Sequence, residues 1–336
     1  MKKRIPYRSL LIPVILFLLL ITHTDKAVAG VTEGLTQCLQ VIIPSLFPFF
    51  FITCWLNSKL LGSTIPFLGG IRKLLKLPDG SESLLLMGFL GGYPVGAKTI
   101  SDAYKKKAVS LETAHILLGY CNNAGPSFIF GICHILFSPS WLPWVIWGLQ
   151  IVSALITALL LPRPKQTSCP HHTASNLSVS SALRKSIIIT ATVCGWILLF
   201  KVLLAFISPF ALFRRSKYVL SGILEISNGC LLLTDLFPLS LRFLFFSAFL
   251  SLGGLCVYLQ TVSAASSTGT GLYLTGKCIQ CGVCILITIP VSVLIFHELP
   301  FSVPAMLAIT LSCIIAILIL FRKSRKKCGN YDYDCV

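Results

Sequence analysis

Apolar runs of membrane-spanning length recur along this chain, and they limit its possible folds more than any other feature. Residues 141–161, 187–210, 278–296 and 303–321 are close to the length that crosses about 30 Å of hydrocarbon as a helix. Hydrophobic residues make up 55% of the 336 residues and charged residues 12%, which lies outside the range of soluble globular domains. The sequence therefore predicts an all-α polytopic membrane protein.

The chain is strongly basic, with 28 Lys and Arg against 11 Asp and Glu and a net charge of +17. The basic residues form short clusters beside the apolar runs, and no basic stripe alternates with aromatic residues on a soluble module. This placement is typical of topology signals and of contact with lipid head groups. We therefore expect membrane lipids as partners and do not expect nucleic acid.

Two segments of the first half are interrupted by helix-breaking residues. The stretch 84–96 contains GFLGGYPVG and is too short to span, so it is predicted to re-enter the membrane as a hairpin. The stretch 114–137 is long enough to span, but Asn122, Asn123 and Gly125 interrupt its centre. It is predicted to be a broken transmembrane helix.

The second half repeats this order. Glu225, Ser227 and Asn228 interrupt the short run 218–237, and Gly253 with Gly254 breaks the candidate span 241–259. With every direction reversed between the halves, the pattern predicts an inverted repeat with two re-entrant hairpins and two broken transmembrane helices. Such repeats are typical of secondary transporters.

Five regions follow from this pattern. They are an N-terminal transmembrane anchor (1–30), a first Gate-like repeat (31–161), a cytoplasmic linker (162–186), a second Gate-like repeat (187–297), and a last transmembrane helix with a basic tail (298–336). Retention of the first segment is favoured over cleavage after 27–29, because Asp25 and Lys26 precede that site. This topology places Arg214, Arg215 and Lys217 on the outer side of the membrane, where basic residues are uncommon. Either their loop binds an anion, or the predicted number of membrane crossings is wrong by one.

Broken backbone at membrane depth predicts a binding site, because unpaired backbone groups persist there only against protein or a water-filled cavity. Glu225 is the most informative residue, since a carboxylate within an apolar run is costly unless it faces a cavity or a proton path. The alternatives are that Glu225 caps an interfacial helix and that the glycines serve helix packing. The candidate substrate-binding residues are Gly91, Gly92, Tyr93, Pro94, Gly96, Lys98, Asn122, Asn123, Gly125, Glu225, Ser227, Asn228, Gly253, Gly254 and Gln260.

Other patterns carry weaker signals. Cys278, Cys281 and Cys284 have a spacing seen in iron–sulfur proteins, but they begin an apolar run and are interpreted as small hydrophobic residues. Residues 271–277 spell GxxxxGK without the following Ser or Thr of a phosphate-binding loop, and they are predicted to form a flexible loop. We expect no metal, no cofactor and no catalytic residue.

Four ordered motifs resemble a known family. They are GGYPVGAKTISDAY (91–104), CNNAGPSFIFG (121–131), LEISNG (224–229) and LGGLCVYLQ (252–260), and the resemblance covers most of 35–321. The chain resembles the YlbJ-type sporulation integral membrane proteins, also called SpoVV, within the nucleoside-recognition or Gate-domain membrane proteins. It departs from their pattern at Cys256, where serine is expected, and at Ser227, where threonine is expected.

The resemblance implies a fold similar to concentrative nucleoside transporters and a role in endospore formation. It implies movement of dipicolinic acid from the mother cell across the outer forespore membrane. Helix N-termini at 91–96 and at Gly125, with Asn122, Asn123 and Lys98, would suit the carboxylates of this small anionic solute. Glu225 would then handle a coupled proton or orient its hairpin.

Two other functions stay open, a nucleoside or nucleobase carrier and a non-transporting membrane scaffold of the spore envelope. An enzyme is not expected, because the sequence offers no nucleophile–base pair and no metal set. A homo-oligomer and a coupled proton or sodium ion stay open as partners.

Overall fold

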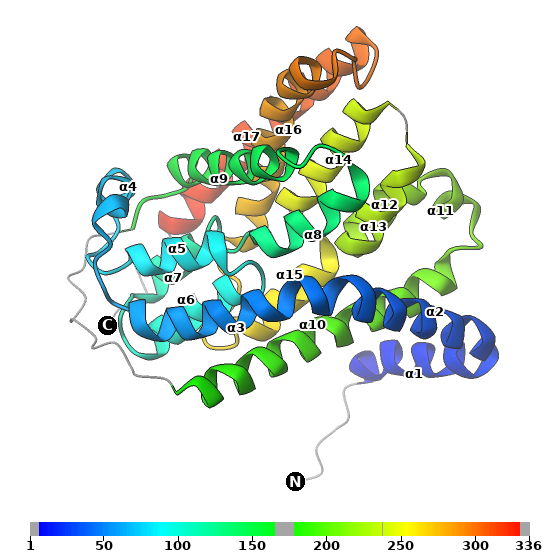
Figure 1. Cartoon of the computed structure of the whole chain (residues 1–336), viewed down its shortest axis with the longest axis horizontal. Helices are drawn as coiled ribbons and strands as arrows, with labels where there is room; N and C mark the ends of the chain where they lie inside the picture. The colour runs from blue at the N-terminus through cyan, green and yellow to red at the C-terminus, as the bar shows by residue number, and fades with distance from the viewer. Residues whose placement is uncertain (1–6, 165–177, 237, 330–336) are drawn as a thin grey trace.

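The chain is built from helices (Figure 1). The computed structural model describes residues 7–164, 178–236 and 238–329, and these residues contain no strand. Six of the described helical segments are long and apolar enough to cross a membrane: Thr24–Leu60, Leu142–Leu160, Val179–Ile207, Leu239–Ala264, Tyr273–Phe296 and Val303–Arg322. The prediction of an all-α polytopic membrane protein is confirmed.

The first of these segments is one continuous helix made of α2 (Thr24–Gln37), the π-helical turn η1 (Cys38–Ile42) and α3 (Ile43–Leu60). Pro44 is the second residue of α3 and has no N–H, so the carbonyl one turn earlier loses its α-helical donor, and the wider π turn lies at this point. The predicted boundary at residue 30 lies inside this helix. The shorter helix α1 (Tyr7–Thr22) precedes it.

The long helix α10 (Val179–Ile207) lies alongside α2 and α3 (Figure 1). Gly30 and Gly34 face it, and a Cβ atom on Gly30 would lie 3.0 Å from the carbonyl oxygen of Lys201. Small residues at this four-residue spacing allow the two helices to approach closely. The helix already includes residues 179–186 of the predicted linker, whose residues 165–177 lie outside the described chain.

Helices are interrupted at the four predicted places. Residues 91–94 separate α5 (Glu82–Leu90) from α6 (Val95–Lys105), and residues 119–125 separate α7 (Leu111–Leu118) from α8 (Pro126–Leu136). Glu225 separates α12 (Lys217–Leu224) from α13 (Ile226–Leu232), and Gly253 separates α14 (Leu239–Leu252) from α15 (Gly254–Ala264). The inverted relation between the two halves stays a prediction.

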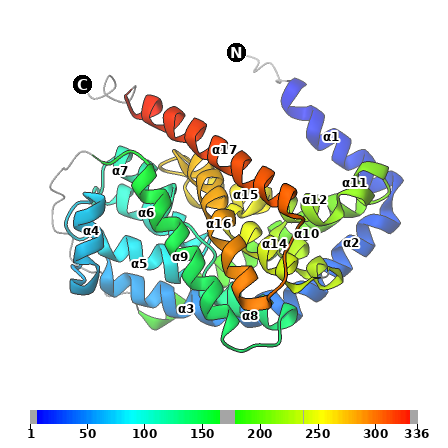
Figure 2. The ribbon, with the colours of Figure 1, turned by 90° about the horizontal axis from the view of Figure 1, so that it is seen from above.

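The remaining helices surround these broken segments (Figures 1 and 2). Along α17, large apolar side chains such as Leu307, Leu311 and Leu318 are more than half exposed. In a bilayer this face contacts lipid. The remaining elements are η2 (Pro66–Leu68), α4 (Gly69–Leu75), α9 (Leu142–Leu160), α11 (Ala211–Arg215), η3 (Leu233–Asp235), α16 (Tyr273–Phe296) and α17 (Val303–Gly329).

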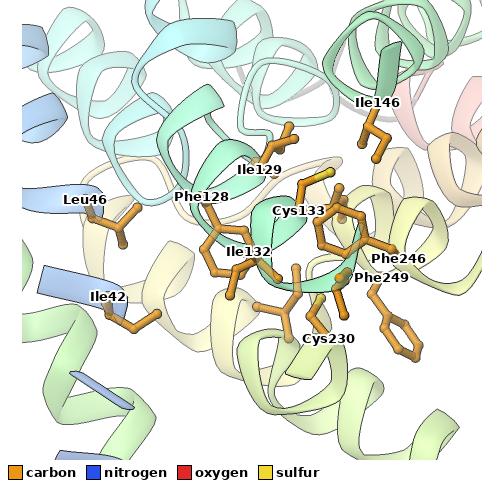
Figure 3. Close-up of a cluster of buried hydrophobic side chains, with 14 of the residues drawn as sticks. Ile42, Leu46, Phe128, Ile129, Ile132, Cys133, Ile146, Cys230, Phe246 and Phe249 are labelled. Carbon is orange, nitrogen blue, oxygen red and sulfur yellow. The ribbon is translucent and has the colours of Figure 1, made fainter. Parts of the chain in front are cut away.

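The main apolar core gathers around α8. Figure 3 shows Phe128 and Ile132 of α8 between Ile42 and Leu46 of the long N-terminal helix and Cys230 of α13. Burial of these side chains holds the two broken segments against the long helix. The core therefore fixes the position of both breaks.

The prediction of a flexible loop at 271–277 is wrong for residues 273–277. Tyr273 begins α16, and Lys277 is fully buried within it. Its ammonium donates hydrogen bonds to Asn123 Oδ1 at 2.7 Å and Gln280 Oε1 at 2.8 Å. These contacts extend the apolar helix one turn earlier than the hydropathy pattern indicated.

Candidate functional site

The four interruptions approach one another around a small central cavity of about 20 Å³, which has room for about one water molecule. Three of them and the helix after the fourth supply part of its lining, and the long N-terminal helix and α10 supply the rest. Of the candidate residues predicted from the sequence, those that line it are Gly91, Gly92, Tyr93, Gly125, Glu225, Ser227 and Gln260. The sequence pattern had assigned these residues to one site, and they lie around one cavity although they come from four separate segments.

The first hairpin and the first broken helix cross at two glycines. A Cβ atom on Gly92 would lie 2.9 Å from the backbone nitrogen of Gly125, and Gly92 has a φ of +70°. Any larger residue at this crossing would separate the two breaks or strain the backbone. The crossing forms one wall of the central cavity.

Glu225 caps the second hairpin at the cavity. Its side chain is 1% exposed, and it accepts hydrogen bonds from the backbone N–H of Ser227 at 3.0 Å and of Asn228 at 2.6 Å. The Ser227 hydroxyl lies 2.7 and 2.8 Å from its two oxygens. A carboxylate thus satisfies the N-terminal amides of α13. Glu225 is thus the N-cap of α13 and is buried, and the position of this cap relative to the membrane surface stays a prediction.

Aromatic rings form much of the remaining wall, from Phe50, Tyr93 and Phe128. The Tyr93 hydroxyl is buried and has no hydrogen-bond partner among the described residues. Ser127 and Phe128 lie in the first turn of α8, where backbone N–H groups have no partner within the helix. The wall therefore combines flat apolar surfaces with hydrogen-bond donors.

The two asparagines of the first broken helix lie behind this wall. Asn122 accepts a hydrogen bond from the backbone N–H of Ala97 at 3.1 Å and donates one to the Thr261 hydroxyl at 2.9 Å. It thus joins the break to α6 and α15. Asn123 donates to the Tyr120 carbonyl at 2.7 Å and accepts from Lys277.

Other predicted residues lie outside the central cavity lining. Gly96 packs against the backbone at Cys121, and Gly254 packs against the carbonyls of Gly222 and Ile223. Pro94 precedes α6, and Gly253 has a φ of +81° at the break before α15. Lys98 is partly exposed on α6 and pairs with Asp102 at 2.7 Å.

Asn228 faces a different part of the molecule. Its Oδ1 accepts a hydrogen bond from the buried Lys201 of α10 at 2.6 Å, and Lys201 also pairs with Glu33 of α2 at 2.5 Å. Lys201, Glu33 and Lys277 are not among the candidate residues predicted from the sequence. Lys201 could have been found from the sequence, because it is a charged residue within the apolar run 187–210, just as Glu225 is a charged residue within the run 218–237.

The cysteines that the structure describes are free thiols. Cys278, Cys281 and Cys284 lie on α16, and the Cys284 thiol donates to the Ser247 carbonyl at 3.5 Å. No group of three or more metal-binding side chains occurs among the described residues. These thiols pack between helices.

Comparison with known proteins gives one line of similarity. No family model matches the chain, and no solved structure does. The chain is similar to the sporulation integral membrane protein YlbJ of Bacillus subtilis (strain 168). The two sequences are 29% identical over 123 residues, which cover 35% of this chain and 29% of YlbJ. The match thus spans less than a third of the length of YlbJ, and it supports the resemblance to YlbJ-type membrane proteins.

Proposed function

We propose that this chain is a sporulation membrane transporter that moves dipicolinic acid, a small planar dicarboxylate, from the mother cell across the outer forespore membrane. The observation that carries the proposal is the approach of four interrupted helical segments around one interior cavity. Packing between helices does not require four breaks to gather at one point. The similarity to YlbJ supports the sporulation context.

The chemistry of the cavity wall supports a planar anion. The rings of Phe50, Tyr93 and Phe128 offer flat apolar surfaces to a pyridine ring. The N-terminus of α8 at Ser127 offers amide donors to a carboxylate. Glu225 already occupies the N-terminus of α13, so its role in the proposal is to orient the hairpin or carry a coupled proton.

The cavity of about 20 Å³ is too small for dipicolinate. The proposal therefore requires the two hairpins to separate from the core during transport, as gating motions do in transporters with broken helices. A coupled sodium ion and a homo-oligomer are compatible with this scheme. The proposal includes no enzymatic activity.

The test is uptake of dipicolinate into proteoliposomes that contain the purified full chain, with uridine as a parallel solute. We expect dipicolinate uptake that Glu225→Gln lowers at least about tenfold, because the amide cannot accept both backbone hydrogen bonds of the cap or carry a proton. Glu298→Gln, at an exposed position in the loop after α16, serves as the control and should leave uptake unchanged.

The other outcomes favour the competing functions. Uptake of uridine without dipicolinate would replace the proposal with a nucleoside carrier. If neither solute enters although the protein is folded and inserted, a membrane scaffold becomes the better interpretation.

A further inference from the structure

A polar groove lies between α2, α10 and α13, on the other side of the second hairpin from the central cavity. It has two lobes of about 400 and 770 Å³, and both include Glu33, Lys201 and Asn228 in their walls. The first lobe adds Lys26, Ser208 and Lys217. The second lobe adds Thr32, Thr36, Gln37 and Gln40.

The charged and amide side chains of the lining favour a polar occupant. Glu33, Gln37 and Lys201 lie on helices of transmembrane length, and such groups at membrane depth face water-filled cavities or solute paths. Lys26, Lys201 and Lys217 outnumber Glu33 among the charged groups of the two lobes. The groove therefore favours an anion.

The ion pair at the junction of the lobes is asymmetric. The Lys201 side chain is 4% exposed, whereas the side chain of its partner Glu33 is 69% exposed. The buried ammonium is fixed by Asn228, and close packing at Gly30 and Gly34 holds its helix against α2. A carboxylate from solution could take the place of Glu33 without moving Lys201.

A second observation independently indicates a ligand. Gln37 is 6% exposed and lines the second lobe, and neither its Oε1 nor its Nε2 has a hydrogen-bond partner within the described residues. A buried side-chain amide without partners is costly. An occupant with polar atoms would satisfy it.

The groove is also adjacent to the central cavity. Asn228 in the groove follows Ser227, which lines the central cavity, and Val41 in the second lobe precedes Ile42, which lines that cavity. The wall between the two spaces is thus made by neighbouring residues of η1 and α13. Movement of the second hairpin would join them.

We propose that Lys201 is the anion-recognition residue of this groove, and that a carboxylate of the incoming solute displaces Glu33 from Lys201 before the solute reaches the central cavity. In naming a dicarboxylate as the solute, the inference rests on the proposed function. Glu33 acts as the exchangeable partner that holds Lys201 in place when no solute is bound. Asn228 transmits the exchange to the second hairpin.

The experiment measures dipicolinate binding to the purified full chain by its effect on thermal unfolding, together with uptake into proteoliposomes. Lys201→Gln should weaken binding by about tenfold or more, because it removes a charged hydrogen-bond donor. Glu33→Gln should strengthen binding by up to about fivefold, since it removes a competitor from a partly exposed ion pair. Lys105→Gln, at an exposed position on α6, is the matched control for loss of one positive charge.

If Lys201 recognises the anion, Lys201→Gln lowers the affinity for dipicolinate and Glu33→Gln raises it. If the ion pair is purely structural, both substitutions break it and change the affinity in the same direction. Changes of the same sign, or binding unchanged in both variants, would overturn the inference while wild-type uptake could still support the proposed function. If the two variants change the affinity in opposite directions but the wild type shows no uptake, the inference stands and the proposed function is overturned. Absence of saturable dipicolinate binding to the wild type would overturn the inference.

Discussion

At the scale of single residues, the informative side chains are the ionisable ones within apolar segments. Glu225 accepts two backbone N–H groups and one hydroxyl, so its carboxylate replaces the helical carbonyls that the N-terminus of α13 lacks. Lys201 and Lys277 are buried against amide oxygens of residues next to two of the breaks. Each of these three groups thus contacts an interrupted segment.

Glu225→Ala should lower the free energy of unfolding by about 1–3 kcal/mol, because the amides of Ser227 and Asn228 lose their buried acceptor. Thermal unfolding in detergent measures the effect. Glu298→Ala removes an exposed carboxylate and should leave the melting temperature unchanged. Equal melting temperatures for the wild type and Glu225→Ala would show that the cap does not stabilise the fold.

At the scale of elements, the breaks were predictable and their partners were not. Clusters of Gly, Pro and Asn within apolar runs are local signals, so the sequence indicated the interruptions at Gly91–Gly96, Asn122, Glu225 and Gly253. The crossing of Gly92 with Gly125 and the bond between Asn122 and Thr261 join distant segments, and no local pattern encodes such pairs. The groove was missed because its polar lining is spread over α2, α10 and α13.

Gly92→Ala should lower the free energy of unfolding by about 1–3 kcal/mol, because its φ of +70° disfavours a side chain and its Cβ would meet the backbone of Gly125. Gly148→Ala and Gly195→Ala are the matched controls, since a Cβ atom at either helical position meets nothing within 4 Å. They should be neutral or slightly stabilising. Thermal unfolding compares the three variants, and a similar melting temperature for all three would argue against a tight crossing.

At the scale of the whole molecule, many polar side chains are buried and many large apolar side chains lie on the surface. The central cavity lies between helices, whereas large apolar side chains such as Leu307, Leu311 and Leu318 are exposed along α17. This distribution is the one that a bilayer requires. It also separates the helices that position the site from a helix that serves mainly as a lipid contact.

Replacing both Leu311 and Ile315 by Lys should disturb the insertion of α17, since each Lys near a helix centre costs about 2.5–3.5 kcal/mol. Both side chains are about half exposed. The measurement is protease access to a tag after Val336 in sealed vesicles, where we expect a mixture of two orientations. As the control, replacing both residues by Ala should leave α17 in a single orientation. A single orientation of α17 in the Lys variant would indicate that this face does not contact lipid.

The π-helical turn η1 has a consequence for which sequence changes this protein can tolerate during evolution. Gln40 and Val41 line the groove, while Ile42, Leu46 and Phe50 line the central cavity, so one helix serves both spaces. Loss of one codon within Cys38–Ile42 would restore a regular helix but rotate every later residue by about 100°. We therefore expect apolar point substitutions on the lipid side of this helix to be tolerated and a change of its length across the turn not to be.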